Sequence, residues 1–597
     1  MSYLNLQDFI KKLDEEKEII RIETPVDPYL ELAEIHRRVI AANGPALLFT
    51  NVKDKKFPVA TNLFGSKKRV DLAFGKKPEE FLRLAVLAAE QAFPPSLKKI
   101  WKFRHLLTDL MKVGTKTTSK RHYEKIPQAD LTQLPTITSW IEDGGPFLTL
   151  PLVHTRGAKG DNLGIYRIQI FSENETGMHF QIGKGGGYHL YEAEQENRPL
   201  PVHIYLGGPP ALMLSAIAPL PENVPEILLA SLIQGKKLRR YEDSSCSHLL
   251  DFEFCLQGAV PPHVRKPEGP FGDHYGYYSL QHDYPVFQVK NIFHAKNPIF
   301  PATVVGKPRQ EDFYLGDYLQ EMLSPLFPLV MPQVQDLWSY GETGYHALTA
   351  AVIKERFQRE AVSAAFRILG EGQLALTKFL LILDKRLDLR DFKSVLIHLL
   401  ERVQWEKDLY IISELSMDSL DYSGPKINHG SKGILLGIGE PVRGLKSTFE
   451  ARKELPNFIK KVEPFCPGCL VIEVPAYIDD KDCIEKLAHH EDFSSWPLLI
   501  AVDNVKKALI SEAAFLWTTF TRFEPAADIY AKGVKLRRFH PSLTGPVVID
   551  ARMKPWYPKE LFCDKDTARR VSARWKEYFP QGNILMGDSD WGHLKDK

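Results

Sequence analysis

Cysteine, long apolar runs and a surplus of either charge are all scarce in this sequence. The 597 residues include six cysteines, a sparse usage that favours reduced thiols in a cytoplasm over a disulfide framework. No stretch approaches the roughly 18 consecutive apolar residues of a membrane span, and no secretory signal is visible near Met1. The net charge of +2 predicts no overall attraction to nucleic acid or to an anionic membrane.

The length predicts several domains rather than one core. Residues 1–125 and 315–455 alternate strand-like and helix-like segments, which is typical of α/β domains. Residues 126–314 are short β-runs separated by Gly and Pro, a pattern that favours a barrel or a sandwich. Residues 456–597 form a C-terminal extension of ordinary globular composition. We find no internal repeat in the sequence.

Periodicity and breaker residues predict the individual elements. In residues 225–234, Pro225 suits the first position of a helix and Gly235 its end. Helices are also expected at 1–18, 29–42, 314–323 and 390–403, and strands at 46–50, 164–171, 201–206, 286–293, 374–384 and 409–415. The basic stretch at 95–125 is interpreted as a helix with one solvated basic face rather than as a nucleic-acid patch.

The first candidate functional segment is residues 161–170, with the sequence DNLGIYRIQI. A strand here would place Arg167 and Gln169 on the face opposite Tyr166 and Ile168. A cation and an amide on one face favour a cavity or solvent over the core. Taken alone, an exposed arginine on an edge strand is the plainer interpretation of Arg167.

Two further segments carry carboxylates that a site could use. Glu226 lies in the first turn of a helix, where it either offsets the helix dipole or binds a metal, and the sequence leaves the two level. Glu268 and Asp273 are separated by Gly-Pro-Phe-Gly, which cannot continue a helix, so a tight turn can direct both acids into one space. Two acids with one arginine suit the binding of a carboxylate and the transfer of a proton. The alternative is a solvated surface turn, which the neighbouring aromatic residues disfavour.

These three segments, in this order and at these spacings, resemble the UbiD decarboxylase family. The family patterns are Asn-x-Gly-x-Tyr-Arg, a Pro-x-Pro before a helix with an early Glu, and Glu-Gly-Pro-Phe/Tyr-Gly-Asp/Glu followed by Gly-Tyr-Tyr. Further agreement lies in TNLFG at 61–65, GKP at 306–308 and SGPK at 423–426. The resemblance spans residues 20–440, and the ordered set is far more specific than any single motif.

The resemblance implies both a fold and an activity. The fold is an N-terminal α/β domain, a central split β-barrel that binds a flavin, and a C-terminal α/β domain followed by the extension. The activity is non-oxidative decarboxylation of an aromatic (hydroxyarene) acid with prenylated FMN. The catalytic positions of the family match Arg167, which binds the substrate carboxylate, Asp273, which delivers a proton, and Glu268, which pairs with Arg167.

The resemblance also implies ligands for a metal and for the cofactor. Asn162 and Glu226 match the ligands of a divalent metal, usually Mn²⁺, that bridges to the cofactor phosphate. The third ligand is expected to be His189, after the turn at 185–187, with His179 as the alternative. A potassium ion commonly accompanies the metal, and its ligands are not placed. The flavin contacts of relatives match Ile165, Tyr166, Arg167, His179, Phe180, Gln181, Lys184 and Gly185.

Partners and pathway follow from the same resemblance. A separate flavin prenyltransferase makes the cofactor, and the family forms dimers or hexamers, so a homo-oligomer is expected. Asp273 in place of Glu, together with the extension, resembles the quinone branch, whose substrates are a polyprenyl 4-hydroxybenzoate (ubiquinone) or a dihydroxynaphthoate, prenylated or not (menaquinone). We favour menaquinone, with non-quinone hydroxyarene or phenylacrylic acids as alternatives. The expected location is the cytoplasm or the periphery of the inner membrane, with no nucleic-acid partner.

Two other classes of function account for parts of the sequence. A flavin reductase with plain FMN would need neither Glu268 nor Asp273, and a non-enzymatic flavin or metal scaffold would tolerate the loss of Arg167. The pair Cys466 and Cys469 would need two more ligands at matching spacing to hold zinc. We therefore interpret this pair as a turn with two free thiols.

Overall fold

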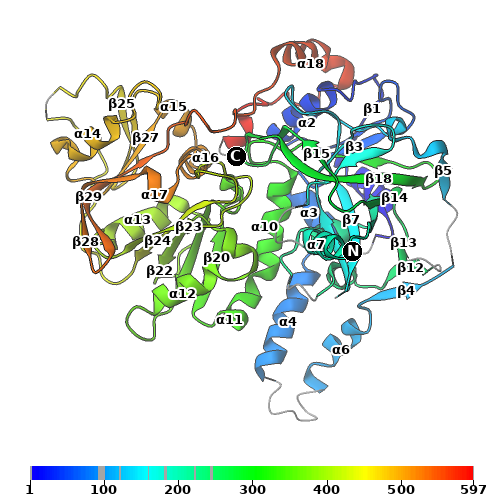
Figure 1. Cartoon of the computed structure of the whole chain (residues 1–597), viewed down its shortest axis with the longest axis horizontal. Helices are drawn as coiled ribbons and strands as arrows, with labels where there is room; N and C mark the ends of the chain where they lie inside the picture. Colours follow the sequence, from blue (N-terminus) through cyan, green and yellow to red (C-terminus); the bar gives the residue numbers. More distant parts are fainter. Residues whose placement is uncertain are drawn as a thin grey trace. The chain divides into compact units, whose positions relative to one another are not determined.

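The computed structural model divides the chain into two compact units. The first unit comprises Met1–Met322 and Glu560–His593, and the second comprises Leu323–Lys559 and Leu594–Lys597. Figure 1 colours both along the sequence. The structure describes residues 3–91, 101–119, 123–158, 160–180, 185–220, 224–242, 247–452 and 454–595. The finer four-part division expected above stays a prediction.

The first unit is built around two larger sheets. One has the strand order β1-β2-β3-β19, and the other runs β10-β18-β14-β11-β7-β8, with β5 and β15 also paired to β18. Their bounds are β1 Ile19–Ile22, β2 Ala46–Phe49, β3 Val59–Thr61, β5 Glu124–Ile126, β7 Pro151–Gly157, β8 Gly160–Ile165, β10 Glu175–Gly177, β11 Leu200–Leu206, β14 Phe254–Val260, β15 Arg265–Glu268, β18 His282–His294 and β19 Phe300–Pro301. Among the described residues the second sheet does not close on itself. The mixed α/β content is therefore confirmed, whereas the split barrel is not.

Short strands and helices complete the first unit. The short strands are β4 Thr115–Thr117, β6 Phe147–Leu148, β9 Ile168–Gln169, β12 Leu238–Glu242, β13 Ser247–Leu249, β16 Phe271–Gly272 and β17 Tyr278–Ser279. The helices are α1 Leu6–Glu15, α2 Glu31–Ala41, α3 Lys67–Phe74, α4 Lys77–Gln91, α6 Arg104–Leu110, α7 Gly185–Gln195, α8 Pro210–Ile217, α9 Glu226–Gln234, α10 Glu311–Leu323 and α18 Lys565–Tyr578. Asn5 caps α1 by accepting a hydrogen bond from the backbone of Asp8, as expected of a residue at that position. The helix expected over the basic stretch at 95–125 is only partly found, because its described residues contain the short helix α6 and then the strand β4. Residues 95–100 and 120–122 of this stretch lie outside the described residues.

Three local expectations near the candidate site need correction. The predicted strand at 164–171 is broken, because β8 ends at Ile165 and β9 begins at Ile168. Arg167 therefore lies between strands, and strict alternation does not set its direction. The glycines at 185–187 begin helix α7 instead of forming a turn before it. Pro225 is the residue before α9 rather than its first helical residue.

The C-terminal return segment, Glu560–His593, belongs to the first unit. Its helix α18 packs against α2 and is fixed there by buried polar contacts. Glu31 of α2 accepts hydrogen bonds from Arg574 (2.6 Å) and from the hydroxyl of Tyr578 (2.6 Å). Glu34 accepts one from the hydroxyl of Ser589 (2.9 Å). Glu34 also pairs with Arg37 and Arg38 of α2 itself, so the return segment adds donors to carboxylates that are partly paired within the N-terminal part of the chain.

The second unit contains two five-stranded sheets of the same design. Their orders are β20-β21-β22-β24-β23 and β25-β26-β27-β29-β28. The strands are β20 Val334–Ser339, β21 Leu348–Ile353, β22 Phe379–Leu383, β23 Leu409–Leu415, β24 Gly430–Gly437, β25 Lys461–Cys466, β26 Cys469–Glu473, β27 Leu498–Val502, β28 Ile529–Arg537 and β29 His540–Asp550. The helices are α11 Phe327–Val330, α12 Glu360–Leu369, α13 Phe392–Arg402, α14 Cys483–His489, α15 Val505–Ala508, α16 Glu512–Arg522 and α17 Pro525–Asp528.

The match between the two sheets extends to strand direction. In each, the first and fourth strands along the chain are antiparallel to their neighbours, and the other three are parallel. The register also agrees: Leu409 pairs with Leu435 in one sheet as Ile529 pairs with Ile549 in the other. The sequence shows no internal repeat, so this likeness is one of backbone topology. We call the two copies the first lobe (334–437) and the second lobe (461–550).

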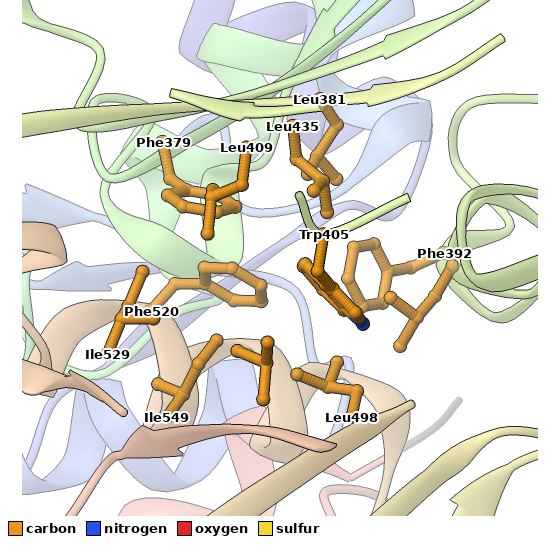
Figure 2. Close-up of a pocket in the computed structure, with 12 residues that line it drawn as sticks. Phe379, Leu381, Phe392, Trp405, Leu409, Leu435, Leu498, Phe520, Ile529 and Ile549 are labelled. Atoms are coloured by element: carbon orange, nitrogen blue, oxygen red, sulfur yellow. The ribbon is translucent and has the colours of Figure 1, made fainter. Parts of the chain in front are cut away.

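Equivalent faces of the two lobes pack on each other around an apolar cavity. Figure 2 shows Leu409 and Leu435 from one sheet facing Ile529 and Ile549 from the other. The remaining lining side chains are Phe379, Leu381, Phe392, Leu396, Trp405, Leu498, Phe520 and Val547. Burying both faces against each other explains why the strands read as continuous apolar runs. Cys466 and Cys469 pair across the β25–β26 hairpin as free, buried thiols, as expected.

Candidate active site

Arg167, Glu268 and Asp273 converge in the first unit. Arg167 Nε and Nη2 donate to the two carboxylate oxygens of Glu268, at 2.9 and 3.0 Å. Arg167 Nη1 donates to Asp273 Oδ2, and Nη2 also donates to the hydroxyl of Ser279 (2.9 Å). A guanidinium has five N–H donors, and these four hydrogen bonds leave one N–H on Nη1 without an acceptor among the residues that the structure describes.

Burial makes this cluster strongly coupled. The side chain of Arg167 is 8% exposed and that of Glu268 fully buried, so the exposed edge-strand interpretation of Arg167 was wrong. Burial alone would raise the pKa of Glu268, but the charge of Arg167 and the contact with His179 lower that pKa to about 2. Burial likewise opposes ionisation of Asp273, yet the His274 hydrogen bond and the Arg167 charge hold its pKa well below the usual range. Both acids are therefore ionised around a charged guanidinium.

Two histidines flank the cluster on opposite acids. His179 Nδ1 lies 3.2 Å from Glu268 Oε2, and its ring packs 4.2 Å from that of Tyr284. Its Nε2 is buried without a hydrogen-bond partner among the described residues. Burial, and then the Arg167 charge, lower the pKa of His179, which keeps the imidazole neutral. His274 contacts Asp273 Oδ1 through both its backbone N–H and its Nδ1, each at 2.7 Å.

The loop that carries Asp273 is held by the return segment. The backbone N–H of Leu561 donates to Gly276 O (3.0 Å), and Tyr277 forms a β-bridge with Glu560. Lys307 is buried beside them, with its Nζ 3.0 Å from Glu560 Oε1 and 2.5 Å from the Leu561 carbonyl that it donates to. The acid loop is thus tied to the C-terminal extension by an isolated β-bridge and one backbone hydrogen bond.

The predicted cofactor contacts that the structure describes lie together beside β8. The rings of Tyr166 and Phe180 meet edge to face at 5.1 Å, and the N–H of Gly186 donates to the Tyr166 hydroxyl (3.3 Å). A Cβ at Gly185 would lie 2.0 Å from Asn162 Oδ1, so a side chain there would require Asn162 to move. Ile165 ends β8 next to them. Gln181 and Lys184 lie outside the described residues.

The three predicted metal ligands share one neighbourhood. Glu226 Oε2 accepts a hydrogen bond from the N–H of Leu163 (2.9 Å), which places its carboxylate beside Asn162. Asn162 pairs across β7 and β8 with Thr155, whose hydroxyl lies 2.8 Å from His189 Nδ1. His179, the alternative third ligand, contacts Glu268 instead.

This neighbourhood can accept a hard cation, although its donors are few. The side-chain amide nitrogen of Asn162 is buried with no hydrogen-bond partner among the described residues, and burial raises the pKa of Glu226. The amide nitrogen is a donor and does not itself bind a cation, so a metal here would take the amide oxygen of Asn162 and the carboxylate of Glu226. In the part of the chain that the structure describes, no group of three or more His, Cys, Asp and Glu side chains is placed to hold a metal. An amide oxygen would therefore have to complete the set.

Sequence reasoning missed several residues of this site. Ser279 and Tyr284 follow the acid motif, and their aromatic and hydroxyl character is the only signal that could have marked them. Lys307 stands in the GKP motif at 306–308, but nothing in that motif indicates a partner more than 250 residues away. Leu561 carries no polar signal at all, since it contributes through its backbone.

Family models match most of the chain and define its class. They are described as the N-terminal, Rift-related and C-terminal domains of 3-octaprenyl-4-hydroxybenzoate carboxy-lyase, and they match residues 10–87, 112–308 and 313–437. The protein is thus a carboxy-lyase, that is, a decarboxylase. This places it among lyases rather than the flavin reductases considered as an alternative. The second lobe lies beyond the last matched residue.

Relatives and solved structures agree with this class. A Chlamydia pneumoniae protein whose name describes it as part of a 4-hydroxybenzoate decarboxylase is 52% identical over 96% of this chain and 98% of its own length. The vanillic acid decarboxylase of Sedimentibacter hydroxybenzoicus in its closed form has a TM-score of 0.64 at 25% identity, covering 76% of this chain and 96% of that one. The UbiD-class enzyme HmfF of Pelotomaculum thermopropionicum, solved with prFMN, has a TM-score of 0.59 at 21% identity and covers 73% and 95%. The chain belongs to the UbiD family, and the resemblance drawn from its motifs is confirmed.

The structure also bears on membranes. Among its described helices, none combines the length and the apolar character needed to cross a bilayer.

Proposed function

We propose that this decarboxylase removes CO₂ from an aromatic (hydroxyarene) acid without oxidation, with prenylated FMN as its cofactor. The proposal rests on the buried convergence of Arg167, Glu268 and Asp273 with one arginine N–H to spare. The cofactor comes from the family resemblance and from the HmfF complex with prFMN. When bound, it supplies the electron sink that an aromatic carbon lacks as CO₂ leaves.

Arg167 binds and orients the substrate carboxylate in this proposal. Its two hydrogen bonds to Glu268 fix the guanidinium plane, so the remaining N–H on Nη1 has a defined direction. Little water reaches the cluster, so the attraction between Arg167 and an incoming carboxylate is much stronger than in bulk water. Glu268 acts by holding Arg167 rather than by meeting the substrate.

Asp273 supplies the proton that replaces CO₂. The bond from the ring carbon to the carboxylate breaks, CO₂ leaves, and the remaining electron pair takes a proton from Asp273. The ligand-free Asp273 is ionised, but a substrate carboxylate on Arg167 adds negative charge beside it and raises its pKa. His274, whose side chain is a quarter exposed, connects Asp273 Oδ1 toward solvent, from which the proton is restored.

Asn162, Glu226 and His189 would hold a Mn²⁺ ion, whose positive charge would help to bind the anionic cofactor. Their amide, carboxylate and imidazole donors suit a hard divalent cation, and metal analysis of the purified protein tests this assignment. K⁺ stays a prediction without ligands. Homo-oligomerisation and the supply of the cofactor by a flavin prenyltransferase also stay predictions.

The substrate is proposed to belong to quinone biosynthesis. The name of the Chlamydia pneumoniae relative supports a 4-hydroxybenzoate ring, whereas the long extension led us to favour a dihydroxynaphthoate. CO₂ release from 4-hydroxybenzoate, its 3-prenylated form and dihydroxynaphthoates distinguishes these acids. Turnover restricted to vanillate or phenylacrylates would place the enzyme outside quinone synthesis.

The decisive experiment produces the chain together with a flavin prenyltransferase. We expect mass spectrometry of the released cofactor to show FMN plus one five-carbon unit, and CO₂ release to depend on that species. Arg167→Ala should abolish CO₂ release, whereas Asp14→Asn, which removes the acid of an exposed Arg21 pair, should not. Full turnover with plain FMN, or in Arg167→Ala, would contradict the proposal.

A further inference from the structure

The β28–β29 hairpin of the second lobe ends in a basic, apolar tip. We define the hairpin tip as residues 532–541; its strands end at Arg537 and His540, which face each other across a two-residue turn. Figure 1 draws this hairpin in orange, with β28 and β29 labelled. It lies far along the chain from the Arg167 cluster, and the proposed decarboxylation does not use it.

Large apolar side chains are exposed on the tip. Phe539 is 97% exposed, Leu536 73% and Val534 61%. Single exposed apolar residues are common on proteins, but three within six positions at the end of one hairpin form a continuous apolar feature. Val534 and Leu536 lie on the same side of β28, because side chains two apart share a face.

Cations surround these apolar side chains. The tip contains Lys532, Lys535, Arg537 and Arg538, and the chain has no Asp or Glu between Asp528 and Asp550. All four cationic residues are exposed. The whole protein carries a net charge of only +2, so this tip is a local concentration of charge. The absence of overall attraction to anionic membranes therefore does not extend to the tip.

The backbone conformation of the two-residue turn does not account for the residue types found in it. Arg538 and Phe539 both have positive φ, at 52° and 63°. Two-residue hairpin turns of this kind prefer Asn and Gly, which adopt positive φ readily. An arginine followed by a phenylalanine is unfavourable there, so the local backbone gains nothing from this choice. A partner outside the chain is the simpler explanation for an aromatic ring held at the apex.

We propose that the hairpin tip docks on a bilayer that contains anionic phospholipid. Phe539 and Leu536 would enter the interface between headgroups and acyl chains, and the four cations would contact lipid phosphates. A second copy that meets this one tip to tip fits less well, because that contact would bring the same cations together. Lysines along β28, the edge strand of its sheet, also discourage edge-to-edge pairing.

Sedimentation of the full-length protein with vesicles tests this inference. The vesicles are phosphatidylcholine alone, or equal parts phosphatidylcholine and phosphatidylglycerol. We expect binding to the mixed vesicles, little binding to the neutral ones, and release as salt shortens the Debye length from about 10 to about 3 Å. Leu536→Ser/Phe539→Ser and, separately, Arg537→Glu/Arg538→Glu should each weaken binding by about tenfold or more.

Matched control variants distinguish vesicle binding by the hairpin tip from nonspecific adsorption of the protein to vesicles. Ile478→Ser removes an apolar side chain that is 78% exposed elsewhere in the second lobe, and Arg569→Glu reverses an exposed charge on α18. Neither should change vesicle binding, and all variants should keep the melting temperature and the CO₂ release of the wild type. Equal binding by wild type and tip variants overturns the proposal. A mass by light scattering that falls in the tip variants, without vesicle binding by the wild type, overturns it in favour of contact between copies.

Discussion

Each unit of the molecule buries an arginine against carboxylate, and the two arginines use their donors differently. In the second unit, Arg552 is fully buried and makes two hydrogen bonds to Asp550 and one each to the carbonyls of Pro475, Asp480 and Lys481. These use all five of its N–H donors. In the first unit, Arg167 makes four, and the nearby His179 Nε2 has no partner among the described residues.

The difference shows how to separate a structural ion pair from a reactive one. Arg167 and Arg552 are both buried and both paired with carboxylate, so neither property alone identifies a functional site. Arg552 is saturated by carbonyls of its own chain, which fixes a loop and leaves no role for a ligand. Arg167 keeps a donor available although leaving donors unsatisfied in a buried place costs free energy. That unused capacity indicates a ligand.

The largest expected effect comes from Asp273→Asn. The amide keeps the shape of the side chain but cannot deliver a carboxylic proton, so CO₂ release should fall by about 10²–10⁴-fold. Arg167 keeps Glu268, so the protein should still fold, which a thermal melt checks. If this variant released CO₂ at the wild-type rate, the interpretation of the Arg167 cluster as the reactive ion pair would be wrong.

Arg552→Met should show the opposite pattern. Removing one partner of a buried pair leaves Asp550 uncompensated and should lower the free energy of unfolding by about 3–5 kcal/mol. The kcat of the remaining folded enzyme should stay near the wild-type value. Urea unfolding and active-site titration measure the two quantities separately. A large fall in kcat with unchanged stability would mean that Arg552 is not purely structural.

Lys307→Met tests the hold of the return segment on the acid loop. Losing the contacts with Glu560 and Leu561 should loosen the loop, and we expect kcat to fall by about tenfold, the effect of a slight misplacement of a catalytic group. KM should change little, because Arg167 rather than Asp273 binds the carboxylate. Lys307→Arg should restore part of the rate. A rise in KM with unchanged kcat would contradict this positioning role.

The smallest effect is expected on the pH profile of His274→Phe. This change removes a side-chain hydrogen bond to ionised Asp273, so the pKa of Asp273 should rise. In the substrate complex, where the bound carboxylate raises this pKa, activity requires protonated Asp273 and falls as pH rises through the pKa. The alkaline limb of kcat should therefore move to higher pH, by about one unit at most. A limb that moves to lower pH, or stays fixed, would separate His274 from the proton step.

Ordered motifs allowed the candidate site to be predicted better than the fold around it. Glu268 and Asp273 are five residues apart across a turn, and that spacing alone indicated that they could meet. The strand at 409–415 matched β23 because its apolar run has clear ends. The direction of Arg167 could not be predicted, since it depends on a break between β8 and β9 that no residue marks.

The likeness of the two lobes could not be predicted from the sequence, for a physical reason. The two lobes share strand order and apolar character, which many sequences satisfy, but not their polar residues. Lys378 and Lys432 precede paired positions in the first lobe and are buried there. Pro497 and Pro546 occupy the equivalent places in the second. With side chains this different, only backbone topology shows that the two lobes are alike.

The position of the return segment in the sequence also determines when, during translation, the acid loop can gain its contacts. Domains generally fold as they emerge from the ribosome, N-terminal parts first. Here the loop with Asp273 is translated early, but its backbone partners Glu560 and Leu561 appear only after the whole of residues 323–559. Asp273, the proposed proton donor, cannot be fixed in place until residues 560 and 561 have been translated. A transcript cut short after the second lobe would therefore yield a protein with every predicted catalytic side chain and an unsupported acid loop.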